Sequence, residues 1–192
     1  MSISNTFFRF VFAFSFFFIS FALIAEPTLE EVVVSARKVD ESVQDVPIAM
    51  SVFTSSDISD AGIERPEDFM ALTPNVVMAN TVNVGDTLVT IRGLTSTRDA
   101  ESNFAFVVDG VLQTNPNAFN RELLDIAQIE VLKGPQGALY GRNATSGAIL
   151  ITTKAPSEES ESTAVIGMGV NNASKLQYVN SGKMGDNVYT RF

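Results

Sequence analysis

Alternating positions and short apolar runs predict several short strands in residues 46–155. In "PIAMSVFTSS", the residues Ile48, Met50 and Val52 recur at every second position, which places them on one face of a strand. The segments "DTLVTIRGL", "AQIEVLKG" and "AILITTK" predict further strands, the second of them over residues 129–132. In "FAFVVDGVLQ", the pair Asp109-Gly110 separates two apolar runs and predicts a tight hairpin turn, because both residue types tolerate a positive φ.

Two short helices are predicted between the first two of these strands. Ser55 or Ser56 can cap a helix in "SSDISDAG" that Gly62 ends. The segment "RPEDFMALTP" has a proline at each end of a second helix, in which Phe69 and Leu72 are expected to face the core together. A further helical turn is expected in "NRELLD". The pattern therefore predicts a small mixed domain with about five short strands and two to three short helices.

The last thirty residues follow a different pattern. In "STAVIGMGVNN", Ala164, Ile166 and Met168 share one strand face, and "KLQYVNSGK" and "VYTRF" predict two more strands after polar turns. Apolar alternation over about ten residues is typical of the wall of a transmembrane β-barrel. A soluble hairpin packed on the domain has the same pattern, and the alternation alone does not separate these interpretations.

The first 25 residues indicate export. Nine of the 15 phenylalanines lie there, Arg9 is the only charge before Glu26, and residues 10–24 are almost wholly apolar. A cationic start, an apolar run and a small residue at its end are the layout of a signal peptide. A permanent membrane anchor is the alternative, but a spanning helix needs about 20 apolar residues. We therefore expect the mature chain to start near Glu26.

Composition argues against several classes of function. The chain has no cysteine and no histidine, and its net charge is −9. It therefore lacks thiolate chemistry and the commonest general base and metal ligand, and it lacks the cationic surface of a nucleic-acid binder. The glycine-rich stretch resembles a phosphate loop, but Gly137 and Gly141 have the wrong spacing and Arg142 follows instead of lysine. We predict no enzyme, no cofactor, no resident metal and no nucleic-acid partner.

A short apolar strand lies on a charged arm near the start of the mature chain. In "EEVVVSARK", three valines stand between acidic and basic residues. An unpaired strand edge is an aggregation hazard in most proteins, unless a partner is meant to pair with it.

Several segments together resemble the amino-terminal part of a TonB-dependent outer-membrane receptor. They are, in order, "LEEVVVSARK", "QDVPIAMSVF", "LTPNVVM", "TIRGLTS", "VVDGV" and "IEVLKGPQGALYGRNATSGAILITTK". The resemblance covers residues 29–155, and residues 129–154 are its most specific part. It implies a plug domain inside an outer-membrane barrel of about 22 strands. It also implies energised import of scarce cargo, most often ferric siderophores and sometimes vitamin B12 or sugars, driven through the periplasm-spanning protein TonB.

The resemblance also implies a domain organisation and a location. The expected parts are a signal peptide (1–25), an N-terminal arm with a TonB box (26–45), a plug (46–155), a linker (156–162) and the first strands of a β-barrel (163–192). The expected fold class is α+β, with an incomplete barrel in this chain. The plug would lie in the cell outer membrane, with barrel strands contacting lipid and the arm in the periplasm. The alternative is a free-standing periplasmic α/β binding domain that does not transport.

The TonB box is the first predicted site. It comprises Glu30, Glu31, Val32, Val33, Val34, Ser35 and Ala36. The three valines would add as an edge strand to a sheet of TonB, where main-chain hydrogen bonds resist pulling together. The alternative is that Val32–Val34 simply pairs within the plug.

Two further sets of residues have roles that the resemblance implies. Arg92 and Lys133 would pair with barrel glutamates and lock the plug in place, although the family commonly has arginine where Lys133 stands, so bidentate pairing would be lost. Solvated strand-end cations are the alternative. Cargo contacts are expected from outward loops, with Arg98 and Phe119 as candidates. Both could equally be plain loop residues.

Overall fold

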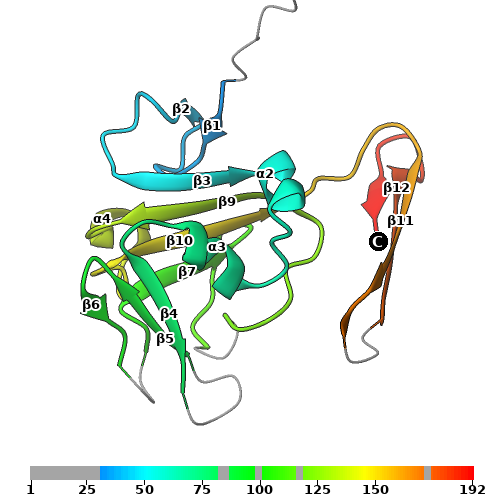
Figure 1. The fold of residues 1–192 in the computed structure, drawn as a ribbon. Helices are drawn as coiled ribbons and strands as arrows, with labels where there is room; N and C mark the ends of the chain where they lie inside the picture. Colours follow the sequence, from blue (N-terminus) through cyan, green and yellow to red (C-terminus); the bar gives the residue numbers. More distant parts are fainter. Residues whose placement is uncertain (1–30, 82–86, 98–100, 116–118, 171–173) are drawn as a thin grey trace, which may run out of the picture. The chain divides into compact units, whose positions relative to one another are not determined.

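A computed structural model describes residues 31–81, 87–97, 101–115, 119–170 and 174–192 (Figure 1). The expected signal peptide, Glu30 and Arg98 lie outside these residues. The elements are β1 (Val33–Val34), β2 (Glu41–Ser42), β3 (Met50–Thr54), α2 (Ser55–Asp60), α3 (Pro66–Leu72), β4 (Val76–Asn80), β5 (Thr87–Ile91), β6 (Leu94–Thr95), β7 (Phe104–Val108), β8 (Val111–Leu112), β9 (Ile126–Lys133), α4 (Gly137–Tyr140), β10 (Gly147–Thr153), β11 (Glu161–Met168), β12 (Ser174–Lys183) and β13 (Tyr189–Arg191).

A mixed five-stranded sheet with the order β3-β9-β10-β7-β8 organises the plug region. β10 runs parallel to β7, and the other neighbours are antiparallel. Gly147, at the start of β10, pairs with Lys133 at the end of β9. A Cβ atom at Gly147 would lie 2.2 Å from the carbonyl oxygen of Leu132. Only glycine therefore permits this close approach between the two longest strands of the sheet.

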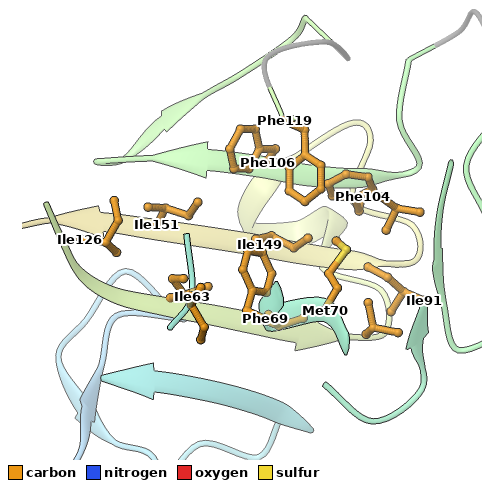
Figure 2. Packing of buried hydrophobic residues seen from close by; sticks show 14 residues of the cluster. Ile63, Phe69, Met70, Ile91, Phe104, Phe106, Phe119, Ile126, Ile149 and Ile151 are labelled. Carbon is orange, nitrogen blue, oxygen red and sulfur yellow. The ribbon is translucent and has the colours of Figure 1, made fainter. Parts of the chain in front are cut away.

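One face of the sheet packs against α3 and the strands β4 and β5, and we call this apolar cluster the helix-side core (Figure 2). From α3 it receives Phe69 and Met70, which are fully buried. Leu72 was expected beside Phe69, but its side chain is 54% exposed, so that prediction was wrong. The buried stripe of this seven-residue helix follows the i, i+3, i+4 positions Pro66, Phe69 and Met70.

The opposite face of the sheet is covered by the N-terminal arm. Val34, Ala36 and Val46 are buried there, against a second cluster that we call the arm-side core. Its sheet members alternate with those of the helix-side core along each strand, as strand geometry requires. They are Ala105, Val107, Leu132, Ala148 and Leu150, and Ala144 completes the buried set. The arm is thus a structural layer of the plug.

The cap of α2 and the turn between β7 and β8 were both predicted from the sequence. Thr54, and neither serine, caps α2, and it forms a capping box with Asp57. The hydrogen bonds from Thr54 lower the pKa of Asp57. The Asp109-Gly110 hairpin is confirmed, with φ values of 47° and 79° between β7 and β8. No helix forms in residues 119–125, and the one-turn helix α4 lies instead in the glycine-rich stretch.

The strands β11, β12 and β13 form a separate antiparallel sheet. Ala164 lies opposite Tyr178 and Ile166 opposite Leu176, which confirms the predicted alternation. The side chains of Ile166, Met168, Leu176 and Tyr178 are exposed. Among the described residues, no helix combines the length and the apolar character that crossing a bilayer would require.

Candidate functional site

The apolar strand of the arm is paired within the plug. Val33 and Val34 form a two-residue ladder with Ser42 and Glu41 on β2. Val34 is 1% exposed, whereas Val33 is half exposed. The backbone N–H of Val43 donates to the carbonyl of Val32 at 3.0 Å. The arm therefore follows the alternative interpretation of the sequence, in which Val32–Val34 pairs within the plug. In this closed arrangement its strand is not free for a partner.

Three side chains of the plug hold the backbone of the arm. Gln128 Nε2 donates to the carbonyl of Val33 at 3.0 Å. The Ser35 N–H donates to Glu130 Oε1 at 3.1 Å, and Ser35 Oγ does so at 3.2 Å. The Tyr140 hydroxyl donates to the carbonyl of Ala36 at 2.8 Å. We call Gln128, Glu130 and Tyr140 the arm clamp, because they contact three main-chain groups between residues 33 and 36.

Glu130 is a carboxyl group inside an apolar layer. Glu130 is 2% exposed, and the residues opposite it on the neighbouring strands are Val52 on β3 and Leu150 on β10. Within the part of the chain that the structure describes, Oε2 has no hydrogen-bond partner. Burial raises the pKa of Glu130, the bonds from Ser35 oppose this, and the charge of Asp40 adds to it. A buried and incompletely satisfied charge is costly, so this side chain needs a structural or functional reason.

The other ionisable member of the arm clamp responds to the same surroundings. Burial and the nearby Glu130 raise the pKa of Tyr140 to about 12. Its hydroxyl therefore stays protonated at neutral pH and remains a donor to the arm. Lys38 Nζ lies 5.7 Å from the centre of the Tyr140 ring, which is a cation–π distance.

Next to the arm clamp, the arm packs less tightly. A groove of about 640 Å³ lies among Ser35, residues 38–40, Tyr140 and the strands β7, β8 and β10. The arm turn at residues 37–40 is exposed, and its Arg37–Glu41 ion pair is on the surface. The arm is therefore held mainly at residues 33–36, and Val46, the residue that follows the arm, is buried as well.

The two predicted lock cations are brought together. Arg92 has a positive φ of 50°, and its Nη1 would lie 2.8 Å from a Cβ atom on Gly134, the residue after Lys133. Lys133 Nζ donates to Ser51 Oγ at 3.1 Å. Burial and the charge of Arg92 lower the pKa of Lys133. Neither cation forms a salt bridge with an acidic side chain of the described residues. Within the described ranges, the charge of the two cations is therefore not balanced by an ion pair.

Phe119 is a core residue. Its side chain is 3% exposed, and its ring centre lies 4.9 Å from that of Phe106 and 5.3 Å from that of Phe104, with edge-on geometry (Figure 2). A cargo contact needs an exposed side chain, so the candidate role of Phe119 was wrong. Its loop returns an aromatic ring to the sheet, where apolar burial outweighs the polarity of the surrounding segment. The other candidate, Arg98, lies outside the described residues.

The arm clamp was missed from the sequence, although one signal was present. Glu130 is the single charge between Ile126 and Leu132, and it lies in the buried part of its strand, residues 129–132. A charged residue at an inward position of a strand is informative because such residues are buried only when they are held by partners. Among the described residues, no group of three His, Cys, Asp or Glu side chains could hold a metal ion.

Known proteins share this architecture. The family described as the TonB-dependent Receptor Plug Domain matches residues 42–148, which is more than half of the chain. This chain belongs to that family. The match includes β3, β9 and β7, and with them Arg92 and the whole arm clamp.

Individual relatives agree with the family. The pesticin receptor of Yersinia enterocolitica is 31% identical over 132 residues, which cover 68% of this chain and 19% of that protein. The vitamin B12 transporter BtuB of Vibrio vulnificus strain YJ016 is 28% identical over 171 residues, which cover 86% of this chain and 27% of the transporter. The crystal structure of the ferric yersiniabactin uptake receptor FyuA from Yersinia pestis is similar with a TM-score of 0.65 and 28% identity, over 74% of this chain and 23% of that one.

The chain thus spans about a fifth to a quarter of the length of these relatives. These similarities confirm the expected α+β plug fold and the resemblance seen in the sequence. They identify a receptor domain of the outer membrane and not an enzyme. The domain boundaries expected from the sequence stay a prediction.

Proposed function

We propose that this chain supplies the plug of a TonB-dependent outer-membrane transporter, and that its cargo is a ferric siderophore. The family supports the first part. The cargo is supported by the ferric yersiniabactin uptake receptor among the similar structures, while the pesticin receptor and the vitamin B12 transporter show that relatives differ in what they take.

The observation that carries the proposal is the arm. Residues 30–36 are the proposed TonB box. In its described part, Val33 and Val34 pair with β2, and the arm clamp bonds to the backbone of residues 33–36. A ladder of two residue pairs is marginal by itself. TonB would replace β2 as the pairing partner of Val32–Val34, and pulling on the arm would then uncover the arm-side core and open a path along the sheet.

Two other predicted features are part of the proposal. Arg92 and Lys133 would meet glutamates of a surrounding barrel, since their charge is not neutralised by the described residues of the plug. The strands β11–β13 would be barrel strands, with the exposed row of Ile166, Met168, Leu176 and Tyr178 toward lipid. Arg98 remains a candidate cargo contact.

The variant Val33→Pro tests the proposal. Proline removes a backbone donor and fixes φ, so the strand cannot pair regularly with TonB. In a receptor that joins this plug to a complete barrel, we expect loss of energised siderophore uptake while siderophore binding is retained. Val33→Thr is the matched control, because it keeps the N–H group and the branched Cβ, and it should transport. Normal uptake by the Val33→Pro variant would contradict the proposal.

A further inference from the structure

The contacts between plug and arm differ from ordinary core packing, because they are directed at main-chain atoms. Gln128 reaches the Val33 carbonyl, Glu130 the Ser35 N–H and Tyr140 the Ala36 carbonyl. The donors and acceptors are separated from residues 33–36 by 95 to 104 positions in the sequence. Contacts of this kind recognise an extended backbone in the way that a peptide-binding groove does.

Two of the clamp residues are also linked to each other. Gln128 Nε2 lies 3.3 Å from Glu130 Oε1, so that one carboxylate oxygen accepts from both Gln128 and Ser35. Gln128 and Glu130 are two apart on β9 and therefore point to the same face of the sheet. Tyr140 comes from α4, and the three side chains approach the arm from two elements of the plug.

Two side chains of the arm also pack into the sheet beside these hydrogen bonds. Val34 and Ala36 insert into the arm-side core, whereas Val33 and Ser35 alternate with them. Beyond residue 36, the turn is exposed and the groove of about 640 Å³ separates it from the sheet. The contacts that keep the arm closed are therefore concentrated in four residues, which is what a release point requires.

We infer that Gln128, Glu130 and Tyr140 form an intramolecular binding site for the arm, and that this site sets the fraction of molecules whose arm is available to a strand-pairing partner. The inference rests on the proposed function for the identity of that partner. Docking of the arm on the plug and pairing of the arm with a partner compete for the same backbone groups. Val33 and Val34 cannot pair with β2 and with the sheet edge of a partner in the same way at the same time. Weakening the clamp should thus open the arm without unfolding the plug.

The absence of cysteine allows a direct test. Val34 and Val89 are each 1% exposed, the first in the arm-side core and the second in the helix-side core. In the purified chain, Val34→Cys reports arm opening and Val89→Cys reports unfolding of the plug, through the rate of reaction with a thiol reagent. Gln128→Leu and Tyr140→Phe are then introduced into each reporter background.

We expect each clamp substitution to raise the labelling rate at position 34 about two- to tenfold, the equilibrium effect of losing one hydrogen bond. Labelling at position 89 should not change. Gln113→Leu and Tyr178→Phe are the matched controls, because these side chains bond to Val111 and Ser162 and not to the arm. They should leave both rates unchanged.

Two results would overturn the inference. One is an unchanged labelling rate at position 34 in both clamp variants, and the other is an equal rise at positions 34 and 89. The proposed function is tested separately by titrating the periplasmic domain of TonB with a peptide of residues 26–45, which has no plug to hold it. If this peptide fails to bind while the labelling results hold, the proposed partner is wrong and the clamp stands.

Discussion

Single residues in this plug owe their roles to distant neighbours. Phe119 follows a polar segment and yet fills the space between Phe69, Phe104 and Phe106. Glu130 lies in an apolar strand and yet keeps a carboxyl group, because the arm backbone covers it and supplies a donor. In both cases the residue type is explained only by what the chain brings next to it.

Replacing Phe119 should therefore affect stability. Phe119→Ala removes a ring from a fully packed cluster, and such changes cost about 3–5 kcal/mol of unfolding free energy. Urea denaturation of the purified chain measures this, with Val77→Ala as control because Val77 is exposed. A loss below about 1 kcal/mol would show that Phe119 does not carry the packing described for it.

The pKa of Glu130 predicts a pH dependence. The folded plug raises the pKa of Glu130, so the neutral carboxyl stabilises the folded plug. This contribution to the free energy of unfolding is complete at pH values below the ordinary pKa of glutamic acid. That contribution is lost as pH rises through the raised pKa. Asp40 and Tyr140 are the titratable groups that face it, and Tyr140 remains neutral throughout.

Glu130→Gln mimics the neutral form, so it isolates this contribution. We expect the variant to be more stable than the natural chain at pH 7.5 and the difference to shrink toward pH 4.5. Urea denaturation of both proteins across this range checks it, and the difference between them cancels the opposite trends of Asp57 and Asp125, whose pKa values are lowered. A difference that is constant with pH would contradict the assignment.

Elements were predicted well where their signals are local. The alternation in β3 and β12, the apolar runs of β5 and β10 and the Asp109-Gly110 turn needed only neighbouring residues. By contrast, β4 pairs antiparallel with β5 and carries exposed positions, so its apolar pattern is weak. The start of α2 was placed one or two residues late, because Ser55, Ser56 and Thr54 are all good caps and only the backbone decides between them.

The position of this cap can be tested. Thr54→Ala removes the acceptor for the Asp57 N–H and the partner of its carboxylate, so we expect a loss of about 1 kcal/mol. Ser55→Ala is the matched control and should change stability by less than about 0.5 kcal/mol. Thermal or urea denaturation of the two variants compares them. A larger effect at Ser55 would restore the cap expected from the sequence.

At the scale of the whole molecule, the central sheet has two unlike coverings. The helix-side core is formed by segments within the plug, and the arm-side core is closed by Val34 and Ala36 of the N-terminal arm. Removal of the arm would therefore expose one apolar face of the sheet and leave the other intact. Under the proposed function, this asymmetry would let a pull at one end act on part of the domain.

Deleting residues 26–36 should expose that face. Burial of one valine side chain is worth about 1.5–3 kcal/mol, and the deletion also removes Ala36 from the cluster. We expect stronger binding of an apolar fluorescent dye and a lower urea midpoint, with the secondary structure retained. Deleting only residues 26–31 is the control, since it removes no member of the arm-side core. Equal dye binding by the two deletions would argue against the arm as a covering layer.

The sequence by itself determined the family, the α+β character, most strands and the position of the arm, because these depend on local periodicity, turn residues and an ordered set of motifs. Only the tertiary structure decided that Val34 is buried, that Phe119 belongs to the core, that Arg92 and Lys133 are neighbours, and that Glu130 holds Ser35. These facts join residues up to about a hundred positions apart, and such contacts arise from how the strands are ordered in the sheet. The periodicity of one segment states which face a residue is on, and not what will lie against that face.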